Sequence, residues 1–148
     1  MKITLVIFSL VAGGAERVMA TMANYWAEKG WSVNLLTLDS GGEPPFYPLH
    51  SAVRHQALGL ASVSKNSLQG LISNVNRVRA LRKAIRHTAP DTVISSMSET
   101  NVLTLLATVG LKVPVIVHEQ IDPYQHLIGR AWVVLRRWTY RRARCVVV

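Results

Sequence analysis

Cysteine and acidic residues are both scarce in this chain of 148 residues, and each shortage excludes a class of protein. The single cysteine, Cys145, cannot form a disulfide framework or a zinc site built on several cysteines, and it favours a reducing compartment. No apolar run reaches the roughly 18 residues that a membrane-spanning helix needs. Only 8 acidic residues oppose 17 basic ones, and the resulting net charge of +9 points to an anionic partner or surface.

Apolar residues, by contrast, are abundant and make up 49% of the chain. That share suits one domain with a core of its own and excludes intrinsic disorder. The apolar stretch that follows Lys2 has some features of a secretion signal. Its single positive charge and the glycines after it favour a buried first strand instead.

Apolar β-branched runs alternate along the chain with segments of helical periodicity. A first helix is expected to follow Gly14 and to end at Gly30. The further expected elements are strands over residues 3–9, 31–38, 53–58, 92–96, 113–118 and from 145 onward, and helices over residues 64–87, 98–109 and 124–142. This alternation predicts an α/β fold, a doubly wound and mostly parallel Rossmann-like sheet with helices on both faces.

The ends of two expected elements carry further predictions. Ser98 is expected to cap the helix over residues 98–109, and Cys145 is expected to be buried in the last strand. A buried strand normally continues into a loop, whereas this chain stops inside the run 146–148. We therefore expect the chain to be the N-terminal part of a longer protein.

Two adjacent glycines, Gly13 and Gly14, stand between the first expected strand and the first helix. Their missing Cβ atoms would let a ligand approach the backbone amides, and a helix N-terminus favours a phosphate or a carboxylate there. A tight turn without a ligand explains the same residues equally well. The pattern is not the G-x-G-x-x-G dinucleotide fingerprint, although Asp39 after the second strand leaves a nicotinamide cofactor open as a minor alternative.

The segment Gly13-Gly14-Ala15-Glu16-Arg17-Val18 resembles the opening of family 4 glycosyltransferases, retaining enzymes of the GT-B fold. Further matches follow in order: Leu36-Thr37-Leu38-Asp39, Pro90-Asp91-Thr92-Val93, Val113-Pro114-Val115 and Tyr140-Arg141-Arg142-Ala143. Within the family, the chain is most similar to transferases that extend lipid-linked oligosaccharides or surface polysaccharides. The resemblance implies that residues 1–148 form the Rossmann-like acceptor-side domain, without the C-terminal donor-binding domain, and that this part alone is inactive.

The resemblance also implies roles for individual residues. Gly13 and Gly14 would approach the donor diphosphate, and His118 and Glu119 are the candidate catalytic residues. The candidate acceptor contacts are Glu16, Arg17, Glu99, Asn101 and Gln120. Gln120 stands where many family members have histidine or arginine, and its amide can still hydrogen-bond a sugar hydroxyl. A structural histidine at a strand end and an acid that complements a helix dipole explain His118 and Glu99 without any function.

Positive charge gathers in the helix expected over residues 64–87, and no acidic residue occurs between residues 44 and 89. Its cations Arg79, Arg82, Lys83 and Arg86 share one face, which we expect to meet an anionic membrane or the pyrophosphate of a lipid-linked acceptor. A generic basic surface and a nucleic acid are the alternatives. No known nucleic-acid motif is present, and the aromatic residues do not alternate with the basic ones as stacking platforms would.

Together these features predict a hexosyltransferase that moves a sugar from a nucleotide-sugar to a lipid-linked glycan or a polysaccharide. We expect it to need no metal or other cofactor and to work as a peripheral protein on the cytoplasmic face of the cell membrane. Its missing C-terminal domain would act in cis, and no nucleic-acid partner is expected. A stand-alone nucleotide- or nucleic-acid-binding α/β module is the alternative.

Overall fold

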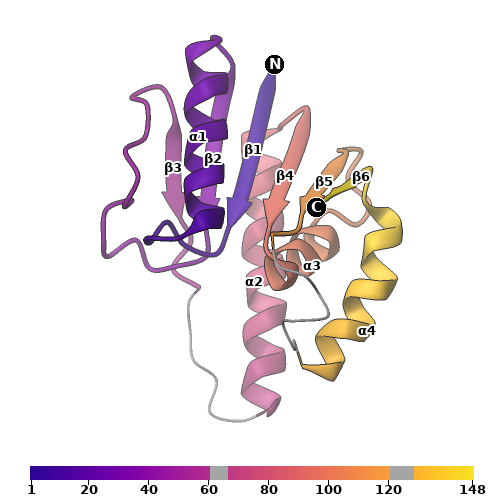
Figure 1. Cartoon of the computed structure of the whole chain (residues 1–148). Coiled ribbons are helices and arrows are strands. Elements are labelled where there is room, and N and C mark those ends of the chain that lie inside the picture. Colours follow the sequence, from indigo (N-terminus) through magenta and orange to yellow (C-terminus); the bar gives the residue numbers. More distant parts are fainter. Residues whose placement is uncertain (61–66, 121–128) are drawn as a thin grey trace.

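A computed structural model describes residues 1–60, 67–120 and 129–148 of the chain (Figure 1). The strands are β1 (Lys2–Ile7), β2 (Ser32–Thr37), β3 (Arg54–Ala57), β4 (Thr92–Ser96), β5 (Val115–His118) and β6 (Cys145–Val147). The helices are α1 (Gly14–Glu28), α2 (Ser67–Thr88), α3 (Ser98–Ala107) and α4 (Arg130–Thr139), followed by the short 3₁₀ helix η1 (Tyr140–Arg142). All strand pairs are parallel, in the order β3-β2-β1-β4-β5-β6.

Helices cover both faces of the sheet, and each face has its own core. On one face, α1 packs Met19 and Ala23 against Leu5 of β1. On the other, α2 and α3 pack residues such as Leu81 and Leu105 against Val6, β4 and β5. Apolar residues face both ways from β1, which explains why its sequence is an apolar run without the alternation of a half-exposed strand. The predicted fold class is therefore confirmed.

The α2 helix runs past the sheet, so its apolar stripe is only partly covered. Figure 1 shows the N-terminal half of α2 extending beyond the carboxyl ends of the strands. Leu81 and Ile85 are buried in the core, whereas Leu71, Ile72 and Val75 are 62%, 54% and 41% exposed. No helix within the described ranges has the length and apolarity that crossing a bilayer demands.

Several element ends differ from the sequence prediction. Ser98 is the first residue of α3 and does not cap it, because Met97 occupies the cap position with a φ of 79°. Cys145 is exposed, since β6 pairs with β5 on one side only. The helix predicted from residue 124 is described from Arg130 onward, because residues 121–128 lie outside the described ranges, and it ends at Thr139.

Arg82 has a structural role within this fold. Its Nη1 donates hydrogen bonds to the carbonyl oxygens of Ala107 and Val109, at 2.8 and 2.6 Å. Carbonyls at a helix C-terminus lack partners inside the helix, and a cation there also complements the helix dipole. Arg82 thus ties α2 to the end of α3, whereas Arg79, Lys83 and Arg86 are exposed.

Replacing Arg82 with glutamine should therefore destabilise the fold, because the last carbonyls of α3 lose a charged donor. We expect the free energy of unfolding in urea to fall by about 1 kcal/mol. Arg79→Gln, which removes the same charge from an exposed position on the same helix, is the matched control and should change stability little. Equal losses in the two variants would contradict the capping role.

Candidate active site

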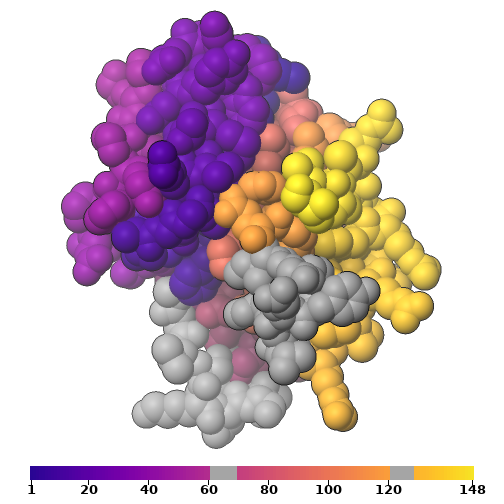
Figure 2. Space-filling model, viewed as in Figure 1, coloured from indigo at the N-terminus to yellow at the C-terminus, as the bar shows by residue number. Residues whose placement is uncertain are grey.

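The carboxyl ends of β1, β4 and β5 meet at one edge of the sheet. The strand order reverses there, since the chain runs from β1 to β2 on one side and from β4 to β5 on the other. Open α/β sheets bind ligands in the crevice beyond this kind of switch point. Three segments follow these strands: the glycine turn at Gly13, the start of α3 at Met97 and the segment of residues 118–120. In the space-filling view, the end of β5 (orange) lies between the N-terminal segment and β6 (Figure 2).

The backbone conformation of the turn does not require glycine at either position. Gly13 is extended, with φ at −176°, and Gly14 begins α1 without a positive φ. A Cβ atom on Gly14 would stand 3.9 Å from Oε1 of Gln120, which is an ordinary contact. No side chain caps α1, so the amides of its first turn have no side-chain acceptor. The turn therefore presents an uncapped helix N-terminus with open space at Gly14.

Glu16 lies close to the turn that it follows. Its Oε2 is 2.2 Å from the place where a Cβ atom of Gly13 would stand, so a side chain at Gly13 would displace this carboxylate. A carboxylate in the first turn of a helix is favoured by the helix dipole. Arg17 is exposed on the next position of α1.

The carboxylate of Glu119 is buried, with only 6% of the residue exposed. The hydroxyl of Ser98 donates to its two oxygens, at 2.9 and 3.1 Å, and the hydroxyl of Tyr140 donates to Oε1. Burial and the hydrogen bond to Glu119 raise the pKa of Tyr140 above its ordinary value. Two hydroxyls from α3 and η1 therefore hold this acid beneath the site.

Asn101 is fully buried beside this pair. Its Nδ2 donates to the carbonyl of His118 at 3.2 Å and to the Tyr140 hydroxyl at 3.1 Å. Within the described ranges its Oδ1 has no hydrogen-bond partner; the same holds for the hydroxyls of Ser95, Ser96 and Thr104. A layer of polar groups therefore underlies the carboxyl ends of β4 and β5.

The structure divides the predicted site residues into two groups. His118 and Gln120 meet, with Nδ1 and Nε2 3.3 Å apart, and Gln120 lies beside Gly14. Glu99 is exposed in the first turn of α3. Glu119 and Asn101, expected to line the pocket, lie beneath it instead, because each is drawn into the hydrogen-bond network around Tyr140.

Sequence reasoning missed the parts that Tyr140 and Met97 play in this site. Tyr140 belongs to a segment that marks the resemblance, and a tyrosine among arginines before a strand gives no sign that its hydroxyl reaches a buried acid. Met97 has a φ of 79° and a ψ of 136°, a conformation that is rare outside glycine and is often found at functional sites. Over the ranges that the structure describes, no three His, Cys, Asp or Glu residues gather where they could hold a metal ion.

Comparisons with known proteins agree with this arrangement. The glycosyl transferase 4-like domain family matches residues 13–148. A relative from Campylobacter jejuni is 33% identical over 141 residues, 95% of this chain. Its name is GalNAc-α-(1→4)-GalNAc-α-(1→3)-diNAcBac-PP-undecaprenol α-1,4-N-acetyl-D-galactosaminyltransferase.

Solved structures with low sequence identity share the fold. Sucrose-phosphate synthase from Thermosynechococcus elongatus superposes with a TM-score of 0.74 at 14% identity, over 99% of this chain and 42% of that one. The Anabaena protein HepE in complex with UDP superposes with a TM-score of 0.63 at 15% identity, over 99% of this chain and 37% of that one.

The sheet order and the helices on both faces define a Rossmann-like α/β domain. The chain belongs to the glycosyl transferase 4-like domain family, as the sequence predicted. It spans 38% of the length of the Campylobacter relative.

Replacing Tyr140 with phenylalanine removes the hydroxyl that donates to Glu119 and leaves the carboxylate with Ser98 alone. Loss of a partner by a buried polar group costs about 1–3 kcal/mol, so we expect the free energy of unfolding in urea at neutral pH to fall by that amount. Tyr25→Phe is the matched control, because Tyr25 is 54% exposed, and its effect should stay within about 0.5 kcal/mol.

The raised pKa of Tyr140 gives the same variant a second readout. Above the ordinary tyrosine pKa of 10.0, the unfolded chain releases this proton while the folded chain keeps it, so wild-type stability falls as the pH rises. The stability of Tyr140→Phe should fall less steeply there. If Tyr140→Phe and Tyr25→Phe matched in both measurements, the buried pair would not stabilise the fold.

Proposed function

We propose that residues 1–148 form the acceptor-side domain of a retaining GT-B glycosyltransferase. The complete enzyme would transfer a sugar from a nucleotide-sugar to a lipid-linked glycan or a polysaccharide. Family membership supports the reaction class. The name of the Campylobacter relative, which specifies a PP-undecaprenol-linked glycan, supports the acceptor class, and the UDP bound to HepE supports a nucleotide-linked donor. A C-terminal donor-binding domain in cis would complete the site.

The observation that carries this proposal is the uncapped N-terminus of α1 behind two glycines that the backbone does not require. Gly13 is extended, and Gly14 has room for a Cβ atom. Neither a positive φ in the turn nor close packing around Gly14 therefore explains why both residues are glycine. Close approach of a ligand to the backbone does explain them. The free amides and the helix dipole favour an anion, and the diphosphate of the donor is the anion that the reaction supplies.

The exposed and half-buried residues around the turn would serve the acceptor. Glu16, Arg17, Glu99 and Gln120 can hydrogen-bond or pair with sugar groups, and His118 lies beside Gln120. Glu119 and Asn101 would act from beneath, by fixing the segment that carries His118. Catalysis would come from electrostatic stabilisation of the departing diphosphate, and we expect no bound metal to be needed.

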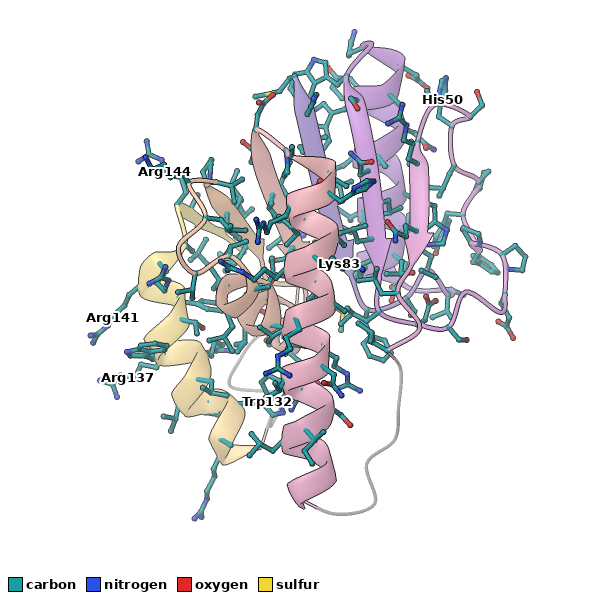
Figure 3. All side chains as sticks on the ribbon, turned by 180° about the vertical axis from the view of Figure 1, so that it is seen from behind. His50, Lys83, Trp132, Arg137, Arg141 and Arg144 are labelled. Carbon is teal, nitrogen blue, oxygen red and sulfur yellow. The ribbon has the colours of Figure 1, made fainter. Side chains whose placement is uncertain are left out.

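The exposed surface beyond the strand ends supports a membrane-bound setting. The outer face of α4 presents Val133, Val134 and Trp138, which are 48%, 68% and 59% exposed, next to the exposed cations Arg130 and Arg137. Apolar residues mixed with cations on an outward helix face are typical of helices that lie in the membrane interface. Arg137, Arg141 and Arg144 point away from the body of the molecule (Figure 3).

The exposed end of α2 adds to this surface. The N-terminal half of α2, which carries the exposed Leu71 and Ile72, extends beyond the carboxyl edge of the sheet, the edge at which the glycine turn lies (Figure 1). A membrane contact at this edge would bring a lipid-linked acceptor to the site. The enzyme would then work as a peripheral protein on the cytoplasmic face of the cell membrane, and Arg79, Lys83 and Arg86 would face lipid headgroups or the acceptor pyrophosphate.

The first test of the proposed function replaces Gly14 with valine in the complete enzyme. The side chain fits the fold, because a Cβ atom there makes only an ordinary contact, but it would block approach of a diphosphate to the amides of α1. We expect sugar transfer to fall at least 100-fold, with urea stability changed by less than about 1 kcal/mol.

Gly42→Val is the control for that test, since Gly42 is an exposed loop glycine without a positive φ. It should transfer sugar at the wild-type rate. Wild-type transfer by Gly14→Val would overturn the donor role of the turn.

The membrane setting is tested with a triple variant, in which Arg79, Lys83 and Arg86 become glutamine and Arg82 is kept for its role at α3. Basic residues near an anionic bilayer gain about 1 kcal/mol each, so binding to anionic liposomes should weaken by up to about 3 kcal/mol. Binding of the wild type should also decrease at high salt. The measurement is co-sedimentation with anionic and with neutral liposomes.

A second triple variant, in which Lys29, Arg54 and Lys112 become glutamine, removes the same charge from exposed positions on other elements. It should bind anionic liposomes better than the α2 variant does. If both variants bound anionic liposomes equally, the weaker binding would follow from the lower net charge and not from the position of the cations on α2. Tighter binding of the wild type to RNA than to liposomes would favour a nucleic-acid-binding module instead.

A further inference from the structure

A second pocket lies away from the glycine turn, on the face of the sheet that carries α2. Its volume is about 390 Å³, within the range of small-molecule sites. Residues of β1, β2 and β3 and of the last turn of α2 line it, among them Lys2, Ser32, Asn34, Arg54, Gln56 and His87. Seen from behind, α2 leaves this part of β2 and β3 uncovered (Figure 3).

The sheet register builds the polar floor of this pocket. Residues two apart on a strand share a face, so Ser32 and Asn34 point the same way as Leu36, which joins the core under α2. The pairing of β2 with β3 sets Asn34 beside Arg54 and Leu36 beside Gln56. A parallel strand covered on both faces is ordinarily apolar throughout. β2 departs from that pattern at Ser32 and Asn34, where the pocket opens, and at Thr37, whose hydroxyl donates to Asp39.

Asn34 shows that the pocket is more than an uncovered surface. The residue is only 8% exposed and lines the cavity, yet its amide makes no hydrogen bond with the rest of the described chain. The amide is not among the fully buried polar groups that lack a partner in the described chain, so its atoms open onto the cavity. An amide that opens onto a cavity can obtain its partner from a ligand.

The remaining lining groups define the chemistry of that ligand. Lys2 and Arg54 bring positive charge, and no carboxylate lines the cavity. His87 in the last turn of α2 lines the same cavity, and Lys2 and Arg54 are the lining groups that neutralise a ligand. His55 pairs with Leu35, which faces α1, and its Nε2 lies 3.1 Å from the Thr37 hydroxyl, so its imidazole is directed away from the floor of the cavity. No Phe, Tyr or Trp offers a surface on which a base or a sugar ring could stack.

We propose that this pocket binds a small phosphate-bearing anion, a site separate from the one that would take the sugar donor. Lys2 and Arg54 hold the phosphate oxygens, and the amide of Asn34 donates to the same group from the floor. The six residues of β1 separate the pocket from the glycine turn by roughly 17 Å, at about 3.3 Å per residue. A ligand here cannot be the reacting sugar donor at the turn, so it acts as a structural or regulatory anion.

The test is a titration of the ¹⁵N-labelled protein with inorganic phosphate, pyrophosphate and glucose 6-phosphate at constant ionic strength, followed by amide chemical shifts. Residues 32–37 and 54–57 should show saturable shifts. The relative affinities of the three probes indicate whether the natural ligand is inorganic phosphate, a pyrophosphate or a sugar phosphate. Shifts at residues 13–17 report the glycine turn separately, so this result does not depend on the proposed function.

Asn34→Leu is the decisive variant, because leucine matches asparagine in size and removes the unpartnered amide. It should fold with unchanged or higher thermal stability and bind phosphate at least tenfold more weakly at residues 32–37. Arg54→Gln should weaken binding to a similar degree, and Lys112→Gln, which removes an exposed cation that does not line the cavity, should bind as the wild type does.

Three results would overturn the proposal. They are shifts confined to residues 13–17, equal affinity in Asn34→Leu and the wild type, and the same shifts with chloride at matched ionic strength. If Asn34→Leu fails to fold, the comparison of Arg54→Gln with Lys112→Gln decides the question, because both variants change only exposed cations.

Discussion

The buried carboxylate of Glu119 joins three segments that are far apart in the sequence. The segment after β5 carries it, while Ser98 at the start of α3 and Tyr140 in η1 donate to it. Asn101 closes the group by bonding both Tyr140 and the carbonyl of His118. A buried acid must keep its donors, so the start of α3, the end of β5 and the approach to β6 cannot move independently. The positions of His118 and Gln120 opposite the glycine turn depend on this constraint.

Much of the fold could be predicted because parallel strands leave a strong signal. The apolar run of β1 reflects burial on both faces of the sheet, and the periodic Leu81 and Ile85 of α2 reflect burial on one face of a helix; a sequence shows both patterns directly. The exposure of Leu71 could not be predicted in this way, since periodicity reveals an apolar face but not where the covering sheet ends. The exposure of Cys145 depends in the same way on which strands lie beside β6.

The site was predictable in its location but not in its internal contacts. Gly14 and His118 follow strands, and topology alone brings such residues to one edge. Whether Glu119 would face the crevice or the interior depends on Tyr140, a partner 21 residues away, and no local pattern encodes that pairing. Arg82 illustrates the same limit, because its helical face matches that of Arg79 and only the nearby end of α3 gives it a different role.

The backbone and the side-chain packing at Met97 favour different residue types. Its φ of 79° favours glycine, while its side chain packs against the core beneath α1 and therefore favours a large apolar residue. Its amide also donates to the carbonyl of His118, which joins the ends of β4 and β5. Glycine would relieve the backbone and leave a gap, and a β-branched residue would fill the gap at a higher conformational cost. Few residue types satisfy both demands, so evolution has little freedom to redirect the first turn of α3 through this position.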